Sequence, residues 1–260
     1  MIQKKNILTQ TKGVITQKVV LELRSLYKSF GENKVLNNFN LQLFEGENLV
    51  IMGKSGSGKS VMIKCLVGLM ESDSGTISVM QKDITKLNQE ALDLLRAEIG
   101  FLFQGSALYD SMTVRENLEF PLRRHPKKFE KKIDTEMLVI DALKSVGLVS
   151  AIDLMPSELS GGMKRRVALA RTLILKPKII LYDEPTSGLD PITAKEIIIL
   201  IQEIQKKYGT SSLIITHDVD CARVISDRMI LLIDGRDYAV GTFGELSTSK
   251  DPKIKAFFKQ

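Results

Sequence analysis

The chain has 260 residues, of which 43% are hydrophobic and 26% charged, and its formal net charge at pH 7 is +6. Its apolar runs are far shorter than the roughly 20 residues of a membrane span, and the N-terminus has no apolar core of a secretory signal, so we expect a cytoplasmic chain that does not itself cross a bilayer. Cys65 and Cys221 are far apart and match no metal-binding spacing, so we expect buried free thiols.

The first segment of the chain, residues 1–18, is polar, and we expect a flexible extension ahead of a packed domain at residues 19–243. Alternation of apolar and polar residues at 19–23 and 39–43 predicts half-exposed strands of an antiparallel β-subdomain. Five apolar runs indicate strands buried on both faces, and the helical patterns between many of them predict a parallel α/β sheet. These runs are 48–52, 99–103, 178–182, 212–216 and 229–233.

Between about residues 107 and 162 the pattern becomes helical, which predicts a helical subdomain inserted into the sheet domain. Within it, Ile133, Met137 and Ile140 are spaced for one apolar helix face. Gly147 is placed to end that helix.

The last third of the chain contains one more long helical pattern, at 193–207, with Pro191 near its start. Residues 244–260 are expected to form a C-terminal tail. Positive charge concentrates in residues 123–132, a run that fits either a solvated face or a surface that docks against an acidic partner or anionic lipid. No ladder of aromatic residues interleaves these charges, so we expect no nucleic-acid binding.

A glycine-rich segment follows the first buried run and precedes a helical pattern. Its order, a strand, a loop and a helix, directs successive backbone N–H groups at a polyphosphate, which also meets the positive end of the helix dipole. In this role Lys59 would reach the β- and γ-phosphates and Ser60 would ligate Mg²⁺. The segment reads G-x-x-x-x-G-K-S and comprises Gly53, Lys54, Ser55, Gly56, Ser57, Gly58, Lys59 and Ser60.

Two adjacent acids, Asp183 and Glu184, end the buried run at 178–182. They therefore emerge at the carboxyl edge of the sheet, where open α/β sheets bind ligands. Asp183 is placed to hold Mg²⁺, and Glu184 to orient and deprotonate an attacking water. The alternative is that both acids cap a strand or the next helix.

Two further polar residues end neighbouring strands at the same edge. His217 follows the run at 212–216, where a neutral imidazole would contact the γ-phosphate and the attacking water. Gln104 follows the run at 99–103, where its amide would touch the Mg²⁺ shell and the helical insert. Capping or packing remains the alternative for His217, and a plain surface position for Gln104.

The residues Ser160, Gly161 and Gly162 begin another helical pattern. Ser160 resembles an N-cap, and the two glycines expose backbone N–H groups at a positive helix end. This would be a second anion site, separate in sequence from the first. Its presence suggests that it serves the nucleotide of another subunit.

Together these segments resemble the nucleotide-binding subunit of ATP-binding cassette (ABC) transporters, from about residue 19 to residue 241. The resemblance implies a P-loop NTPase (RecA-like) core with named motifs: Walker A at 53–60, the Q-loop at Gln104, the signature at 159–163, Walker B with its catalytic acid at 179–184, and the switch histidine at His217. It also implies that Asp190 of a D-loop couples two sites and that Phe30 stacks on adenine. For Phe30, core packing is the alternative.

The same resemblance implies an activity and an assembly. Two copies of the chain would bind two ATP molecules, with Mg²⁺, between the Walker A loop of one copy and the signature of the other. Lys59, Glu184 and His217 would carry hydrolysis. Closing and opening of this homodimer would drive a membrane permease, which would hold the chain at the cytoplasmic face of the inner membrane.

A narrower resemblance is to the ATPases of the Mla and Mce phospholipid transport systems. It rests on residues 155–166, where Met163 replaces the usual glutamine of the signature and paired basic residues follow. The group usually has glycine just before an Ala-Leu pair, whereas here Ser106 stands at that position. Residues 251–258 resemble the tail that in this group leads to an arm across the dimer.

Other functions fit parts of the pattern. An importer or exporter ATPase for another solute would share the whole catalytic core. A cassette ATPase acting on DNA or ribosomes would carry two cassettes or a long coiled-coil insertion, for which 260 residues leave no room. A P-loop kinase would not need the signature or His217.

Overall fold

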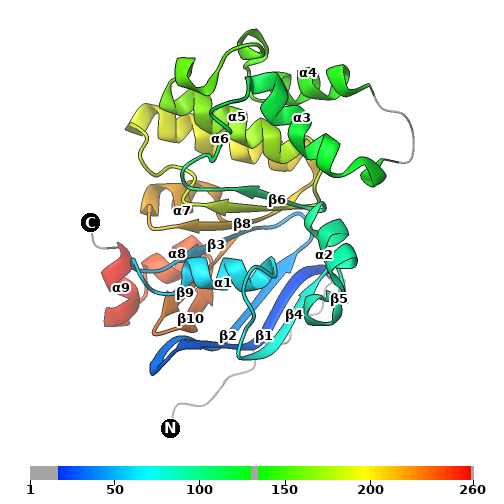
Figure 1. The fold of residues 1–260 in the computed structure, drawn as a ribbon. Coiled ribbons are helices and arrows are strands. Elements are labelled where there is room, and N and C mark those ends of the chain that lie inside the picture. The colour runs from blue at the N-terminus through cyan, green and yellow to red at the C-terminus, as the bar shows by residue number, and fades with distance from the viewer. Residues whose placement is uncertain (1–16, 130–133, 259–260) are drawn as a thin grey trace.

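The computed structural model describes residues 17–129 and 134–258. Almost all of the predicted N-terminal extension, and Ile133 of the predicted helix face, lie outside the described residues. Within them the chain forms two sheets and a group of helices on top of one sheet (Figure 1).

The larger sheet has six strands in the order β10-β9-β3-β8-β7-β6, parallel except for β10 at one edge. The smaller has four antiparallel strands in the order β2-β1-β4-β5. The strands are β1 Val19–Phe30, β2 Asn33–Phe44, β3 Asn48–Met52, β4 Ser74–Val79, β5 Lys82–Asp83, β6 Ile99–Leu102, β7 Ile179–Asp183, β8 Ser211–Thr216, β9 Arg228–Ile233 and β10 Arg236–Gly241.

Helices α1–α7 lie between these strands in the chain, and α8 and α9 follow the last strand. The α-helices are α1 Lys59–Leu66, α2 Gln89–Arg96, α3 Val114–Arg124, α4 Thr135–Ser145, α5 Gly161–Leu173, α6 Pro191–Tyr208, α7 Val219–Ile225, α8 Phe243–Ser247 and α9 Pro252–Phe258. Short 3₁₀ turns lie at Ile84–Lys86, Pro126–Lys128, Val149–Ala151 and Pro156–Glu158. No described helix is both long and apolar enough to cross a membrane.

The central strands are apolar throughout because both faces of the large sheet are covered. In β3, Val50 and Met52 belong to the core beneath α3–α6, whereas Leu49 and Ile51 belong to the core beneath the small sheet. Successive strand residues point to opposite faces, so a fully covered strand needs both sets to be apolar. The predicted buried strands and the antiparallel β-subdomain are both present.

Helix α1 lies between the two sheets (Figure 1). Its residues Met62, Ile63 and Leu66 are buried in the same core as strands of both sheets. The phosphate loop that precedes α1 is therefore anchored by a strand buried on both faces and by a helix held between two layers.

The predicted apolar face of α4 is wrong. Met137 is 56% exposed, and the helix instead buries Leu138, Val139, Ala142 and Leu143. Four apolar residues on that face give more burial against α3 and α5 than the sparser set that includes Met137.

The predicted end of α4 at Gly147 is observed. Gly147 has a φ of +71°, and its N–H donates to Lys144 O while the N–H of Leu148 donates to Leu143 O. These are the two bonds of a Schellman motif, which needs a left-handed residue at this position.

Within the C-terminal segment, helices α8 and α9 pack against the main core of their own chain. Ile254 is buried, and the rings of Phe243 and Phe258 meet edge to face with centroids 5.4 Å apart.

In the basic run at residues 123–132, the Lys128 ammonium pairs with the Glu98 carboxylate at 2.8 Å, so part of the positive charge of that run is neutralised within the fold.

Candidate nucleotide-binding site

A cavity of about 600 Å³ lies at the carboxyl edge of the large sheet. The ends of β3, β6, β7 and β8 surround it, because parallel strands present their carboxyl ends at one edge. Ten of the predicted residues line it together with Val35 and Val61: Ser55, Gly56, Ser57, Gly58, Lys59, Ser60, Gln104, Asp183, Glu184 and His217.

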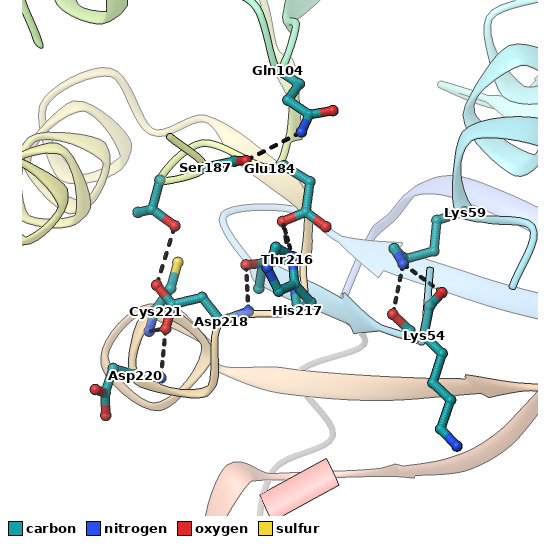
Figure 2. A network of polar contacts seen from close by, with 12 residues as sticks. Lys54, Lys59, Gln104, Glu184, Ser187, Thr216, His217, Asp218, Asp220 and Cys221 are labelled. Carbon is teal, nitrogen blue, oxygen red and sulfur yellow. Dashed lines mark hydrogen bonds and ion pairs between the residues drawn. The ribbon is translucent and has the colours of Figure 1, made fainter. Parts of the chain in front are cut away.

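The phosphate loop joins β3 to α1, and at Gly58 its backbone conformation requires glycine. Gly58 has a φ of +103°, and a Cβ there would lie 2.8 Å from Val35 O. The ammonium of Lys59 donates to Gly53 O at 2.6 Å and Lys54 O at 3.0 Å. The Lys54 side chain extends away from Lys59 (Figure 2).

Burial affects the charges at this loop. It lowers the pKa of Lys59 from 10.5, although the negative charges of Glu184 and Asp183 oppose that shift. It raises the pKa of Asp183 from 3.8, an effect that Glu184 reinforces and Lys59 opposes. Both shifts arise because charged groups lose hydration. A bound phosphate would raise the pKa of Lys59 again, and a bound cation would lower the pKa of Asp183 again.

Two polar groups fit a bound polyphosphate. Ser57 Oγ is buried, and among the described residues it has no hydrogen-bond partner. Within the same residues, the Lys59 ammonium bonds only to the loop's own carbonyls. Buried polar groups are normally satisfied, and phosphate oxygens are acceptors for both.

Glu184 and His217 both line the cavity, and their side chains are in direct contact (Figure 2). Oε2 of Glu184 lies 2.8 Å from Nδ1 of His217 and 3.3 Å from the His217 backbone N. A carboxylate only accepts, so Nδ1 is the donor and Nε2 of a neutral ring is left as an acceptor. Glu184 itself is buried, with a φ of +50°.

The three predicted metal ligands lie in the same cavity. They offer a hydroxyl from Ser60, an amide oxygen from Gln104 and a carboxylate from Asp183, an oxygen set of the kind that Mg²⁺ accepts together with phosphate oxygens. Nε2 of Gln104 donates to Ser187 Oγ at 3.1 Å, while its amide oxygen points away from Ser187 (Figure 2). In the described parts of the chain, no group of three or more His, Cys, Asp and Glu residues is suited to hold a metal.

The signature residues do not line this cavity. Ser160 is the N-cap of α5, and its Oγ accepts from Met163 N at 3.2 Å, as predicted. Gly161 and Gly162 form the first turn of that helix. A Cβ on Gly162 would lie 2.7 Å from Thr193 Cγ2, so the start of α5 packs closely against the start of α6.

Four other predicted residues also lie outside the cavity: Gly53, Lys54, Asp190 and Phe30. Asp190 is the N-cap of α6, and its carboxylate accepts from Ile192 N, Thr193 N and Thr193 Oγ1. Phe30 ends β1 and is 49% exposed, with the ammonium of Lys28 5.6 Å from its ring centroid. The exposure argues against the core-packing alternative for Phe30.

Sequence reasoning missed Arg165 and Ser187. Arg165 is 3% exposed and donates to Phe103 O and Ser187 O. Helical periodicity contains a signal for it, because Arg165 shares a face with the buried Ala168 and Leu169. Ser106 stands where the Mla/Mce group usually has glycine. Its φ is +62°, a conformation that glycine adopts more easily, which accounts for the usual glycine.

Comparison with known proteins places the phosphate loop, Gln104 and Glu184 inside a matched segment. A family model described as ABC transporter matches residues 36–187. The methionine import ATP-binding protein MetN of Clostridium tetani is 43% identical over 242 residues, which are 93% of this chain and 75% of that protein.

Two further relatives have different printed names. The probable ribonucleotide transport ATP-binding protein mkl of Mycobacterium leprae is 39% identical over 94% of this chain and 70% of its own length. The intermembrane phospholipid transport system ATP-binding protein MlaF of Haemophilus influenzae is 36% identical over 92% of this chain and 90% of its own length.

Solved structures agree with the fold. The dimeric ATP-binding cassette MJ0796, in a post-hydrolysis state with ADP and Pi, has a TM-score of 0.76 at 33% identity, covering 86% of this chain and 98% of its own. The protein cbiO1 of Clostridium perfringens, part of an ABC transporter complex, has a TM-score of 0.80 at 30% identity, covering 92% and 94%. The predicted α/β P-loop fold is thereby confirmed.

Proposed function

Since the chain belongs to the ABC transporter family of ATP-binding subunits, we propose that it powers a membrane permease of the Mla/Mce type that moves phospholipids. ATP hydrolysis and partnership with a permease come with membership of the family. The substrate, the shared dimeric site and the individual residue roles are the proposed part.

In the proposed reaction, ATP binds with its phosphates on the loop 53–60, and the ammonium of Lys59 leaves the loop carbonyls for the β- and γ-phosphates. Glu184 accepts a proton from the attacking water, and His217 holds the carboxylate through Nδ1. Mg²⁺ held by Ser60, Gln104 and Asp183 would neutralise phosphate charge. The 2.8 Å contact between Glu184 and His217 supports this assignment.

The signature residues complete the site of a second copy in this proposal. Ser160, Gly161 and Gly162 do not line their own chain's cavity, yet they present backbone N–H groups at a helix N-terminus that suits phosphate. The MJ0796 cassette, a dimer with ADP and Pi, supports the pairing of two copies. ATP would then hold two copies together, and hydrolysis would release them.

A groove beside Gln104 provides a place for the permease. It has a volume of about 530 Å³ and is lined by aromatic rings, with Phe103 43% exposed and Tyr109 42% exposed. Phe103 directly precedes Gln104, so a permease segment seated there would sense the position of the Gln104 side chain. We propose that a cytoplasmic segment of the permease occupies this groove.

The observation that carries the phospholipid assignment is the segment 155–166, which resembles the Mla/Mce group. Within this segment Met155 N donates to Glu158 Oε2 at 2.6 Å, and Met163 packs against the main core. The likeness to MlaF extends over 92% of the chain.

The second candidate is import of methionine or another solute. It is favoured by the 43% identity to MetN, which exceeds the identity to MlaF. The catalytic core would be the same, so only the permease and its cargo distinguish the two.

The test is to purify the chain from its own cells in mild detergent, identify the membrane protein that comes with it, and assay bound phospholipid by mass spectrometry. The Ser160→Arg variant serves as a matched sample, since it should keep the permease while losing ATPase activity. A permease of the Mla/Mce type with phospholipid supports the proposal. A methionine permease, or one unrelated to this group, would contradict it.

A further inference from the structure

Arg165 is a buried cation without a carboxylate partner among the described residues. Its side chain lies on α5 and is 3% exposed. Nη1 donates to Phe103 O at 2.8 Å, Nη2 donates to Ser187 O at 3.2 Å, and Nε has no partner within the described ranges. Burying a guanidinium on backbone carbonyls alone is unfavourable for stability, and burial lowers the pKa of Arg165. An apolar residue would suit packing better, which suggests that this charge has another role.

The two carbonyls that Arg165 holds are both next to the candidate site. Phe103 is the residue before Gln104, and Ser187 follows Glu184 by one tight turn in which Ser187 N donates to Glu184 O at 3.2 Å. Gln104 Nε2 in turn donates to Ser187 Oγ. Arg165, residues 103–104 and Ser187 therefore form a closed ring of hydrogen bonds.

Arg171, two turns further along α5, holds the other end of the same loop. Its guanidinium donates to Ser106 O at 3.0 Å and to Ala107 O at 2.8 Å. Ser106 and Ala107 have φ values of +62° and +48°, which are strained for residues other than glycine. The loop at residues 103–107 is thus held to α5 at both ends.

We propose that Arg165 is a positioning residue that ties the signature end of α5 to Gln104 and to the turn after Glu184 within one chain. It touches neither ATP nor Mg²⁺ and acts through the two carbonyls. When Ser160–Gly162 engage the ATP of a second copy, the ring transmits the movement of α5 to the chain's own Gln104 and Glu184. This inference rests on the shared site proposed above.

The geometry calls for arginine specifically. The planar fork of a guanidinium reaches two carbonyls at once, whereas a lysine ammonium acts as a point donor on a flexible stem. Arg165→Lys should therefore restore only part of the function lost in Arg165→Met.

The test compares purified variants in ATP hydrolysis without a permease, at saturating ATP and varied Mg²⁺. Arg165→Met should lower kcat by about 10-fold or more and raise the Mg²⁺ concentration for half-maximal activity, because charge-assisted hydrogen bonds position Gln104. ATP affinity of the single chain measured in the absence of Mg²⁺ should stay within about twofold, since the loop 53–60 is untouched. The kcat and the Mg²⁺ dependence of Arg165→Lys should lie between those of the parental chain and those of Arg165→Met.

Ser187→Ala provides an independent test because it removes the Gln104 contact without disturbing a buried charge. It should shift the Mg²⁺ dependence in the same direction. The matched control is Arg115→Gln, which removes an arginine paired with Glu136 and Asp153, away from the ring. This control should keep the parental kcat and Mg²⁺ dependence.

Parental kcat and Mg²⁺ dependence in a folded Arg165→Met chain would overturn the inference, as would an equal loss in Arg115→Gln. Should Arg165→Met fail to fold, Ser187→Ala decides alone: a shifted Mg²⁺ dependence supports the ring, and an unchanged one refutes it. A fully active Ser160→Arg variant would instead refute the shared site and with it the movement of α5, leaving the positioning of Gln104 to be judged by the Mg²⁺ dependence.

Discussion

Glu184 combines burial, a left-handed backbone and a histidine contact in one residue. Its φ of +50° is uncommon for a residue with a side chain. The conformation is held by its neighbours, since Glu184 N donates to Ile215 O at 2.9 Å and its carboxylate accepts from His217. Strained residues cluster at functional sites, where the surrounding structure fixes them.

Replacing Glu184 by Gln keeps the shape of the side chain and removes its basicity. We expect ATP binding to be retained, kcat to fall by about 100-fold or more, and a dimer to be trapped with ATP. Steady-state hydrolysis and size-exclusion chromatography with ATP measure both effects. Glu203→Gln, an exposed acid on α6, is the control. Parental hydrolysis in Glu184→Gln would show that another group is the base.

The lowered pKa of Lys59 predicts a pH dependence. Because the buried ammonium deprotonates below the ordinary 10.5, ATP affinity should fall as pH rises through the window between the lowered pKa and that value. The folded chain binds fewer protons than the unfolded chain there, so the stability of the nucleotide-free chain should rise over the same window.

Calorimetric titration with ATP from neutral pH up to about 10 measures the effect, since a lysine of ordinary pKa would stay charged over most of that range. Lys64→Met, which removes an exposed lysine on α1, should keep the parental profile. An affinity that stays constant across the range would contradict the role of the Lys59 charge.

For single residues, the sequence predicted those that end buried strands, because strand ends and a glycine-rich loop leave a local pattern. It did not predict Arg165. A basic residue inside a helix normally reads as solvated, and only the tertiary fold brings Phe103 O and Ser187 O to it.

At the scale of the element, the start of α6 shows how one residue can serve two purposes. Asp190 was predicted to couple two sites, and the structure shows that its carboxylate caps the helix by accepting from two backbone N–H groups and also accepts from the Thr193 hydroxyl. A cap satisfies backbone N–H groups that have no partner inside the helix. The coupling role stays a prediction beside this observed one.

Replacing Asp190 by Ala should lower the free energy of unfolding by about 1 kcal/mol, because the first turn of α6 loses its acceptor. Asp190→Asn should stay within a few tenths of a kcal/mol, since asparagine caps about as well. Urea unfolding of both variants measures the difference. Equal stability of the Ala and Asn variants would mean that the cap contributes nothing.

Most elements could be predicted, because the helices have long periodic patterns and the central strands are buried on both faces and therefore apolar throughout. The apolar face of α4 could not, because two sets of apolar residues compete in that sequence and neighbouring helices decide between them. Met137 faces solvent although its spacing fits a buried stripe. Turn geometry at Ser106 was also hidden, since nothing local requires a serine to adopt a positive φ.

At the scale of the whole molecule, two sheets enclose α1 and bring the ends of four strands to one cavity. The sequence predicted that these strand ends meet at one edge of the sheet, because polar residues follow the buried runs, but it did not predict that α1 lies between two sheets. It also predicted a second anion site at the start of α5, and within one chain the residues of that predicted site lie apart from the cavity. A site divided between two copies accounts for both positions.

The most direct measurement is ATP hydrolysis by a mixture of two inactive variants, Lys59→Ala and Ser160→Arg. In a mixed dimer one site carries both changes and the other carries neither. Equimolar mixing should therefore restore about a quarter of parental activity, since about half of random pairs are mixed and each holds one intact site of two. If each chain held a complete site of its own, mixing would restore nothing, and the account of a shared site would be wrong.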